Sequence, residues 1–235
     1  MRPLDKGESP YETISDYHDA EPFLNDRIGR YCSYCEIPIY HVPEIDHKEG
    51  KYSGGELTKW GNLLYSCKYC NTRKSQKIKF GEKDKWIWPD EDNTFIAYTY
   101  ENGYPKVNEK LLKESVPEVL ERAWSLYDGV DLGFVPQKVT DKDKRWAKRM
   151  EVYGIAEECK NVWDKLKTTE YRETQINSII TLAKQVGFFS VWMSIFEQEK
   201  EIKLQLLQNF PGTAQECFDS DGNVVLDARR NRCTY

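Results

Sequence analysis

Four cysteines in two Cys-x-x-Cys pairs constrain the fold of this 235-residue chain more than any other feature. The pairs are Cys32/Cys35 and Cys67/Cys70, and 31 residues separate them. Four thiolates at this spacing predict a closed tetrahedral site for a structural Zn²⁺ ion. Redox-active dithiols are the alternative, but two such motifs at this spacing do not fit a thioredoxin-like unit. With four protein ligands the ion has no open position, so we expect it to fix the shape of the segment between the pairs.

The segment between and just after the cysteine pairs carries a histidine, a carboxylate and two carboxamides, namely Asp46, His47, Asn62 and Asn71. Hydrolysis of a phosphodiester needs an activated water and stabilisation of the charge that develops on the phosphate and the leaving oxygen. A histidine suits the general base at neutral pH, and Asp46 and Asn71 offer the hard oxygen ligands that Mg²⁺ prefers. Asn62 is expected to brace the backbone near His47. Each residue alone is ambiguous, but the combination predicts a metal-dependent phosphodiester hydrolase.

Basic residues are concentrated directly after the second cysteine pair, although the chain as a whole is acidic, with a net charge of −5. Between residues 68 and 85 there are seven Lys or Arg and two acidic residues. A solvated charged surface is the alternative interpretation. Because an acidic chain gains little non-specific affinity from phosphates, we expect a partner to supply much of the grip on nucleic acid. The residues expected to bind nucleic acid are Lys68, Arg73, Lys74, Lys77 and Lys79.

Apolar periodicity predicts an α+β fold, in which a metal-binding module precedes a mostly helical C-terminal subdomain. The predicted strands span residues 38–45, 62–66, 94–100 and 104–107, the last two joined by an Asn102-Gly103 turn. The predicted helices span residues 19–28, 68–77, 116–127, 141–167, 170–186 and 190–210, with Thr140 or Asp141 and Thr169 as N-caps. The expected segments are an arm with a short helix at 1–30, the metal module at 31–88, a hairpin with a connecting helix at 89–135, and a partner-docking helical subdomain at 136–235.

Composition and cysteine usage favour a cytoplasmic protein that does not enter a membrane. No apolar run approaches the roughly 18 residues of a membrane span, and the first residues lack the apolar core of a signal peptide. Seven cysteines, an odd number, fit a reducing compartment and a metal site better than a disulfide framework. The cysteines and histidines outside the motif are interpreted as buried or free thiols and as structural side chains; they are Cys159, Cys217, Cys233, His18 and His41.

Taken together, these motifs resemble the HNH endonucleases of the ββα-metal class that carry a zinc knuckle. In that class the first histidine is the general base, which corresponds to His47. The preceding acidic residue and the last His or Asn bind the catalytic Mg²⁺ or Mn²⁺, which corresponds to Asp46 and Asn71, and the middle asparagine, here Asn62, orients the loop. The last position is Asn rather than His in this chain, a variation that the class tolerates. The runs that carry the resemblance are Cys32-Ser-Tyr-Cys35-Glu36, Ile45-Asp46-His47, Trp60-Gly-Asn62-Leu-Leu and Cys67-Lys-Tyr-Cys70-Asn71-Thr-Arg-Lys74.

Three further runs resemble the PtuB nucleases of Septu and related retron anti-phage defence systems. They are Met1-Arg-Pro-Leu-Asp-Lys-Gly7, Arg30-Tyr-Cys-Ser-Tyr-Cys-Glu36 and Phe210-Pro-Gly-Thr-Ala214. The resemblance implies a PtuA-type ATPase partner related to ABC and SMC ATPases, docked on the helical half. In a retron it also implies a reverse transcriptase with its msDNA.

Two alternatives to a DNA-cleaving enzyme stay open at the level of sequence. The chemistry uses no 2′-hydroxyl, so tRNA or another RNA is an alternative to DNA, which we favour. The second alternative is a non-catalytic zinc-knuckle adaptor whose helical half binds protein. The acidic net charge favours an adaptor, whereas the presence of Asp46 and Asn71 beside His47 argues against it.

Overall fold

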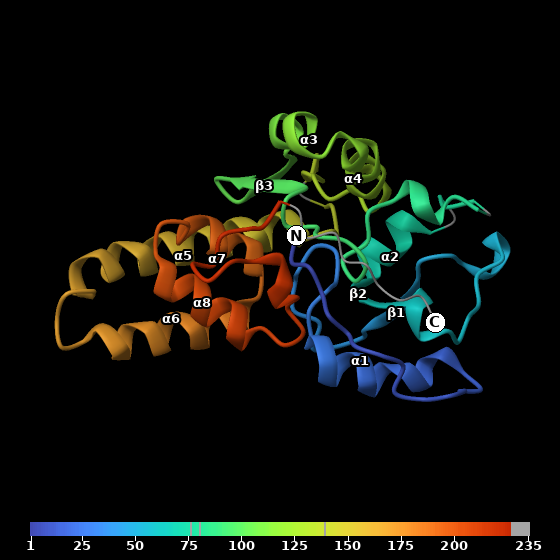
Figure 1. Cartoon of the computed structure of the whole chain (residues 1–235), viewed down its shortest axis with the longest axis horizontal. Coiled ribbons are helices and arrows are strands. Elements are labelled where there is room, and N and C mark those ends of the chain that lie inside the picture. The colour runs from blue at the N-terminus through green and yellow to red at the C-terminus, as the bar shows by residue number, and fades with distance from the viewer. Residues whose placement is uncertain (76, 80, 139, 227–235) are drawn as a thin grey trace.

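The segment that carries the cysteine pairs folds as a β-hairpin followed by a helix. In the computed structural model, which describes residues 1–226 apart from 76, 80 and 139, strand β1 (Glu44–His47) pairs antiparallel with β2 (Leu63–Ser66). Helix α2 (Lys68–Lys74) begins directly after Cys67, whose Sγ accepts a hydrogen bond from the Cys70 amide. A short 3₁₀ turn, η1 (Tyr17–Ala20), and helix α1 (Glu21–Ile28) pack against this hairpin. The result is a ββα unit, on the right in Figure 1.

A second hairpin and two helices form the middle of the chain. Strand β3 (Tyr98–Glu101) pairs with β4 (Tyr104–Val107), and the helices α3 (Glu109–Ser115) and α4 (Pro117–Gly129) follow. The predicted Asn102-Gly103 turn is confirmed, because both residues have positive φ angles, 50° and 75°. Glycine is required at position 103 for a second reason: a Cβ there would lie 2.8 Å from the Cβ of Tyr153.

Helices make up most of the rest of the described chain. Helices α5 (Arg145–Leu166) and α6 (Arg172–Val186) form a long hairpin that extends away from the ββα unit (Figure 1). The shorter helices α7 (Phe189–Ile195) and α8 (Lys200–Asn209) pack against α5 and α6, respectively, and bury Trp192, Phe196 and Leu206. The α+β class is therefore confirmed. The part of the chain that the structure describes contains no helix with the length and apolar character of a membrane span.

Some predicted boundaries were wrong, for identifiable reasons. The strand predicted at 38–45 begins six residues later and ends two residues later, at Glu44–His47. Pro38 and Pro43 lack amide hydrogens and Val42 adopts a positive φ of 54°, which oppose a strand before Glu44. Helix α5 begins four residues later than predicted, since the Asp141 carboxylate accepts from the Gln137 and Lys138 amides and closes the preceding turn.

Two further helix predictions need correction. The single helix predicted at 190–210 is two helices separated by the polar stretch at residues 197–199. Helix α3 was not predicted at all. Thr169 is not the N-cap of α6, which is Tyr171; the Thr169 hydroxyl instead accepts from the Tyr171 amide in the turn before the helix. The basic C-terminal residues and Cys233 lie outside the described residues.

Two buried carboxylates tie distant parts of the chain to the ββα unit. Asp90 forms ion pairs with Lys6 at 2.8 Å and Lys48 at 3.0 Å, and all three side chains are at most 2% exposed. Glu36, which directly follows the first cysteine pair, accepts from the Arg2 amide at 2.6 Å and from both the amide and the hydroxyl of Ser190 at the start of α7. The N-terminal arm and the helical half are thus fixed to the segment that bears the cysteines.

We expect Asp90→Asn to destabilise the protein by about 3–5 kcal/mol, because it removes the charge of a buried carboxylate that the Lys6 and Lys48 ammonium groups share. Urea unfolding measures the change in the free energy of unfolding. Glu101→Gln is the matched control, since Glu101 pairs with Lys106 where both side chains are more than half exposed, and such pairs contribute less than about 1 kcal/mol. Equal stability of the two variants would show that Asp90 does not anchor the arm and β1.

Candidate active site and metal centre

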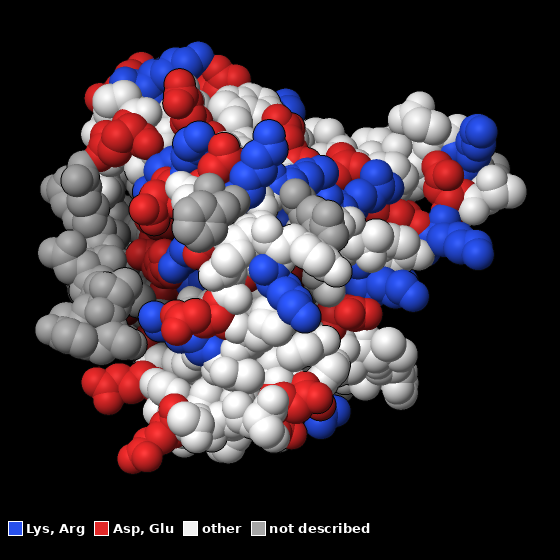
Figure 2. All heavy atoms as spheres, turned by 90° about the vertical axis from the view of Figure 1, so that its right-hand side faces the viewer, with Lys and Arg blue, Asp and Glu red and all other residues white. Residues whose placement is uncertain are grey.

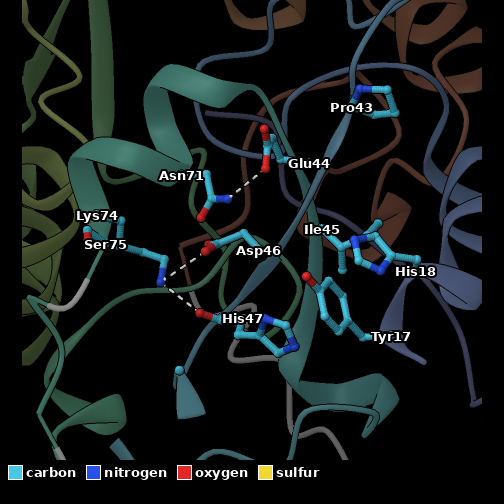
Figure 3. A pocket seen from close by; sticks show the side chains of 11 residues that line it. Tyr17, His18, Pro43, Glu44, Ile45, Asp46, His47, Asn71, Lys74 and Ser75 are labelled. Atoms are coloured by element: carbon cyan, nitrogen blue, oxygen red, sulfur yellow. Dashed lines mark hydrogen bonds and ion pairs between the residues drawn. The ribbon is translucent and has the colours of Figure 1, made fainter. Parts of the chain in front are cut away.

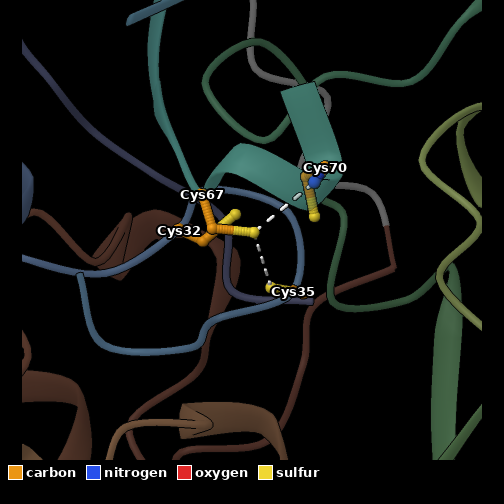
Figure 4. A group of neighbouring side chains, drawn as sticks. All are labelled: Cys32, Cys35, Cys67 and Cys70. Carbon is orange, nitrogen blue, oxygen red and sulfur yellow. Dashed lines mark hydrogen bonds between the residues drawn. The ribbon is translucent and has the colours of Figure 1, made fainter. Parts of the chain in front are cut away.

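The four cysteines of the two pairs converge on one point beneath β2 and α2. Their Sγ atoms all lie within 4.8 Å of one another, and all four side chains are buried (Figure 4). The Sγ atoms of Cys35 and Cys67 are 3.7 Å apart. A tetrahedral Zn²⁺ with Zn–S bonds of about 2.3 Å places its sulfurs about 3.8 Å apart. The geometry therefore fits the predicted structural zinc.

A buried arginine from the helical half adds positive charge to the cysteine cluster. Arg145, at the start of α5 and 2% exposed, donates from Nη1 to the Cys70 Sγ at 3.3 Å. The same guanidinium pairs with Asp143 at 2.8 Å and donates to the backbone carbonyls of Val130 and Asp131. Burial opposes the charge on Arg145, but the Cys70 thiolate and the Asp143 carboxylate raise its pKa. A fixed cation here suits four thiolates, whose charge one Zn²⁺ neutralises only in part.

Two carboxylates and one carboxamide face each other between β1 and α2. Glu44 and Asp46 are two residues apart on β1 and so project from the same side of the strand. The Asn71 Nδ2 on α2 donates to the Glu44 Oε2 at 3.3 Å. Figure 3 shows Asn71 between the two carboxylates, with its amide oxygen on the side of Asp46. The structure thus brings Asp46 and Asn71 together and adds Glu44, which the sequence analysis missed.

Asp46 is a buried carboxylate with two protein partners. It is 2% exposed; Tyr34 donates its hydroxyl hydrogen to Oδ2, and the Lys74 Nζ lies 3.1 Å from Oδ1. Burial raises the pKa of Asp46, against the opposing effects of Lys74 and Tyr34. The two partners therefore do not fully compensate the cost of burying the anion, so additional positive charge at this carboxylate would be stabilising.

His47 is held in one tautomer and one orientation. Its Nε2 lies 2.9 Å from the carbonyl oxygen of Leu57, which can only accept, so Nε2 carries the hydrogen and Nδ1 carries the lone pair. The Tyr17 ring packs edge-on against the imidazole, with centroids 4.7 Å apart. Burial lowers the pKa of His47, although the Leu57 carbonyl and Asp46 oppose the shift. Nδ1 has no hydrogen-bond partner among the described residues and is available to accept a proton.

Asn62 clamps the loop that joins the two strands. Its Oδ1 accepts from the Glu49 amide at 2.8 Å, and its Nδ2 donates to the carbonyls of Glu49 and Glu56 at 2.9 and 3.0 Å. The loop between Glu49 and Glu56 is closed by these bonds, and the carbonyl that orients His47, Leu57 O, follows immediately. Asn62 thus lies where the sequence predicted a brace for the backbone near His47.

The residues expected to bind nucleic acid are found in three environments: exposed without an ion pair to the described part of the chain, bound to neighbouring protein atoms, and buried. Lys68 and Lys79 are exposed and form no ion pair with a described residue. Arg73 pairs with Asp131 at 2.9 Å, and the Lys77 ammonium donates to the carbonyls of Asp128 and Gly129 at the end of α4.

Lys74 does not lie on the surface as expected. It is 2% exposed and donates to the His47 carbonyl at 2.7 Å as well as pairing with Asp46. Since α2 places residues 71 and 74 on one side of the helix, Lys74 follows Asn71 into the pocket. On the face of the ββα unit, basic and acidic side chains are interleaved (Figure 2).

Glu44, Asp46, His47, Asn71 and Lys74 line one pocket of about 220 Å³. The arm contributes Tyr17 and His18, β1 contributes Asp46 and His47, and α2 contributes Asn71 and Lys74 (Figure 3). The sequence analysis treated His18 as structural and did not select Tyr17, because nothing in the linear order relates the arm to β1. In the sequence, the position of Glu44 two residues before Asp46 was the indication that a second carboxylate lies on the same side of the strand.

The cysteine cluster and all pocket residues except Tyr17 and His18 fall within one region of detectable family similarity. Residues 32–77 match the family model of the HNH endonucleases. No curated protein and no solved structure shows detectable similarity to the chain. The match spans both cysteine pairs, both strands of the first hairpin and α2. Residues 32–77 therefore form an HNH endonuclease domain with a buried four-cysteine cluster, and the chain carries the domain of a phosphodiester hydrolase.

Proposed function

We propose that this protein is a metal-dependent DNA endonuclease that uses His47 as the general base and Asp46 and Asn71 as ligands of a catalytic divalent cation. The observation that carries the proposal is the convergence in one pocket of an imidazole with an available Nδ1 and two hard oxygen ligands from separate elements. An adaptor protein has no need for this arrangement.

His47 is positioned to take a proton from a water molecule in the pocket. With Nε2 committed to the Leu57 carbonyl and Tyr17 against the ring, only the Nδ1 edge is available for that proton. Burial keeps the pKa of His47 below its ordinary value, so the neutral form that can accept a proton predominates at pH 7. The water attacks the phosphorus in line with the leaving 3′ oxygen, which yields a 5′-phosphate and a 3′-hydroxyl.

Asp46 and Asn71 fit a small divalent cation by the chemistry of their donor atoms. A Mg²⁺ or Mn²⁺ ion held there supplies positive charge that stabilises the leaving 3′ oxygen. Glu44 holds the amide nitrogen of Asn71 and so keeps the amide oxygen turned away from itself, on the side of Asp46. Lys74 shares the Asp46 carboxylate, so the side chain competes with any cation that binds at Oδ1.

The four-cysteine cluster is proposed to hold a structural Zn²⁺. The sulfur spacing supports this assignment, and the buried Arg145 contributes to charge balance. With Cys32, Cys35, Cys67 and Cys70 as ligands, the ion has no position for substrate, and its role is to hold the ends of the ββα unit together.

The biological setting is proposed from sequence resemblance alone. The runs at residues 1–7, 30–36 and 210–214 support a PtuB-like nuclease subunit of an anti-phage complex with a PtuA-type ATPase. Interleaved charges around the domain support the idea that a partner supplies part of the grip on DNA (Figure 2). Lys68 and Lys79 are the exposed cations of the predicted set that are available to phosphates.

We expect Cys67→Ser to lose the zinc and unfold the ββα unit, because metal binding and folding of such a site are coupled. Elemental analysis of the purified protein measures zinc, with about one equivalent expected in the wild type, and circular dichroism reports folding. Cys159→Ser is the control, since Cys159 is half-buried on α5 outside the cluster. A Cys67→Ser protein with full zinc content and unchanged stability would contradict a zinc role for the cluster.

His47→Ala should reduce plasmid nicking in Mg²⁺ by about 10²- to 10⁴-fold, the usual contribution of a general base. Its zinc content should be unchanged, because His47 is not part of the cysteine cluster. His41→Ala, which alters an exposed histidine outside the pocket, should cleave like the wild type. Wild-type activity in His47→Ala would remove His47 from the base role. If the wild type does not nick DNA either alone or with the ATPase partner, the result would favour a non-catalytic adaptor protein. If the wild type cleaves RNA but not DNA, the result would favour RNA as the substrate.

Asp46→Asn and Asn71→Ala should each raise the Mg²⁺ concentration needed for half-maximal nicking, and EDTA should abolish wild-type activity. Glu44→Gln should have a smaller effect, because Glu44 only positions Asn71 and the carboxamide oxygen of the introduced glutamine can still accept the hydrogen bond from Asn71. Asn177→Ala, on the exposed side of α6, is the control. An unchanged Mg²⁺ requirement in both Asp46→Asn and Asn71→Ala would place the catalytic cation elsewhere.

A further inference from the structure

The loop between β1 and η3 (Trp60–Asn62) presents an aromatic side chain to solvent beside the pocket. Tyr52 lies in the 3₁₀ turn η2 (Lys51–Ser53) and is 85% exposed, more than any other large hydrophobic residue described. In Figure 1 this turn is at the right-hand edge of the molecule. Gly50, two residues before Tyr52, lines the pocket that holds His47. The Tyr52 ring therefore contributes little to packing within the chain and is accessible to a ligand beside the pocket.

The loop holds Tyr52 in a defined position. At its base, Asn62 makes three hydrogen bonds to the backbone of Glu49 and Glu56. The Gly50 carbonyl accepts from the Ser53 amide at 2.9 Å and from the Gly55 amide at 3.1 Å. Glycine is required at position 55, because a Cβ there would lie 1.8 Å from the Glu49 carbonyl oxygen. The exposed ring is therefore carried on a closed, internally bonded turn.

Two exposed cations lie on the same pair of loops as Tyr52. The Ser53 hydroxyl donates to the Ile78 carbonyl at 2.5 Å, which joins the Tyr52 loop to the segment that follows α2. Lys51 precedes Tyr52 and Lys79 follows Ile78; both are exposed, and neither forms an ion pair with a described residue. An exposed aromatic ring with lysines on the same loops is the combination that single-stranded nucleic acids bind, through base stacking and phosphate contacts.

We propose that the Tyr52 ring stacks on an unpaired base of the DNA close to the scissile phosphate, while Lys51 and Lys79 contact neighbouring phosphates. We call these three residues the stacking platform. Bases within a duplex are stacked on their neighbours, so a tyrosine ring stacks most readily on a base that is unpaired or extruded. The platform thus favours DNA with a bubble, mismatch or single-stranded end over fully paired DNA. This inference rests on the proposed nuclease function, because the pocket supplies the reason for DNA to lie beside Gly50.

Binding measured in a non-cleaving background tests the platform directly. The full-length His47→Ala protein in Mg²⁺ is titrated against two fluorescein-labelled duplexes of equal length, one with a central three-nucleotide bubble, and fluorescence anisotropy is recorded. We expect tighter binding to the bubble. Adding Tyr52→Ala should weaken bubble binding about 5- to 100-fold and duplex binding less than twofold, whereas Tyr52→Phe should keep the preference because the ring remains.

The lysines and a distant tyrosine provide the matched comparisons. Lys51→Ala and Lys79→Ala should weaken binding to both duplexes and each should lower the salt dependence of binding by about one unit of slope. Tyr171→Ala should leave binding unchanged, since Tyr171 is also exposed, at 57%, but lies in the turn between α5 and α6.

Three results would overturn the platform: no binding of the bubble by the parent protein, equal loss of affinity for both duplexes on Tyr52→Ala, or no loss at all. Failure of the nuclease proposal is a separate outcome. If the wild type does not cleave DNA but the bubble preference depends on Tyr52, the platform stands without the catalytic role. If the wild type cleaves and Tyr52→Ala binds both duplexes like its parent, only the platform falls.

Discussion

The convergence of four buried thiol groups is the constraint on which the rest of the ββα unit depends. The first pair lies before β1 and the second spans the end of β2 and the first turn of α2, so one ion at this point would close a loop of more than thirty residues. The hairpin has only four residues in each strand, which is too little to be stable in water by itself. Closing its ends through a metal would, together with packing from α1, give the short strands a fixed register. That register in turn determines which way Asp46 and His47 point.

The helical half is joined to this unit through charges as well as through apolar packing. Arg145 reaches from α5 to the Cys70 Sγ, and Glu36 reaches from the first cysteine pair to the amide and hydroxyl of Ser190 on α7. Both contacts are buried, and each connects a residue of the cysteine-bearing segment with a residue more than seventy positions away. A displacement of α5 or α7 would therefore act on the cysteine loops directly. This gives a physical route by which a protein bound to the helical half could affect the pocket.

Local sequence signals predicted the parts of the site that lie between the cysteine pairs. Asp46, His47 and Asn71 were selected from the combination of residue types and from the family resemblance, and the structure places all three in one pocket. Asn62 does not line the pocket but closes the adjoining loop. The Asn102-Gly103 hairpin was predictable because two adjacent residues determine that turn. Local signals were less reliable for the ends of the elements, since the predicted N-caps at Asp141 and Thr169 belong to the turns before α5 and α6.

Features that depend on distant contacts could not be predicted in this way. Tyr17 reaches His47 only because α1 packs on the hairpin, and Arg145 reaches Cys70 from α5. The segment 190–210 was predicted as one helix because its apolar spacing continues through Phe196. In the structure Phe196 is buried as the C-cap of α7, and the chain leaves the helix at that residue. Lys74 is an intermediate case: its position three residues after Asn71 already places both on one side of α2, and a surface role was assigned from charge alone.

The position of Lys74 has a consequence for the metal-free protein. Its ammonium group lies against Asp46 and the His47 carbonyl, so the pocket carries a tethered positive charge of its own. Without it, an ionised Asp46 would be buried with only a tyrosine hydroxyl as partner. With it, Asp46 keeps a counter-charge that belongs to the protein, so a divalent cation bound there as proposed would be able to leave and return while β1 and β2 keep their pairing.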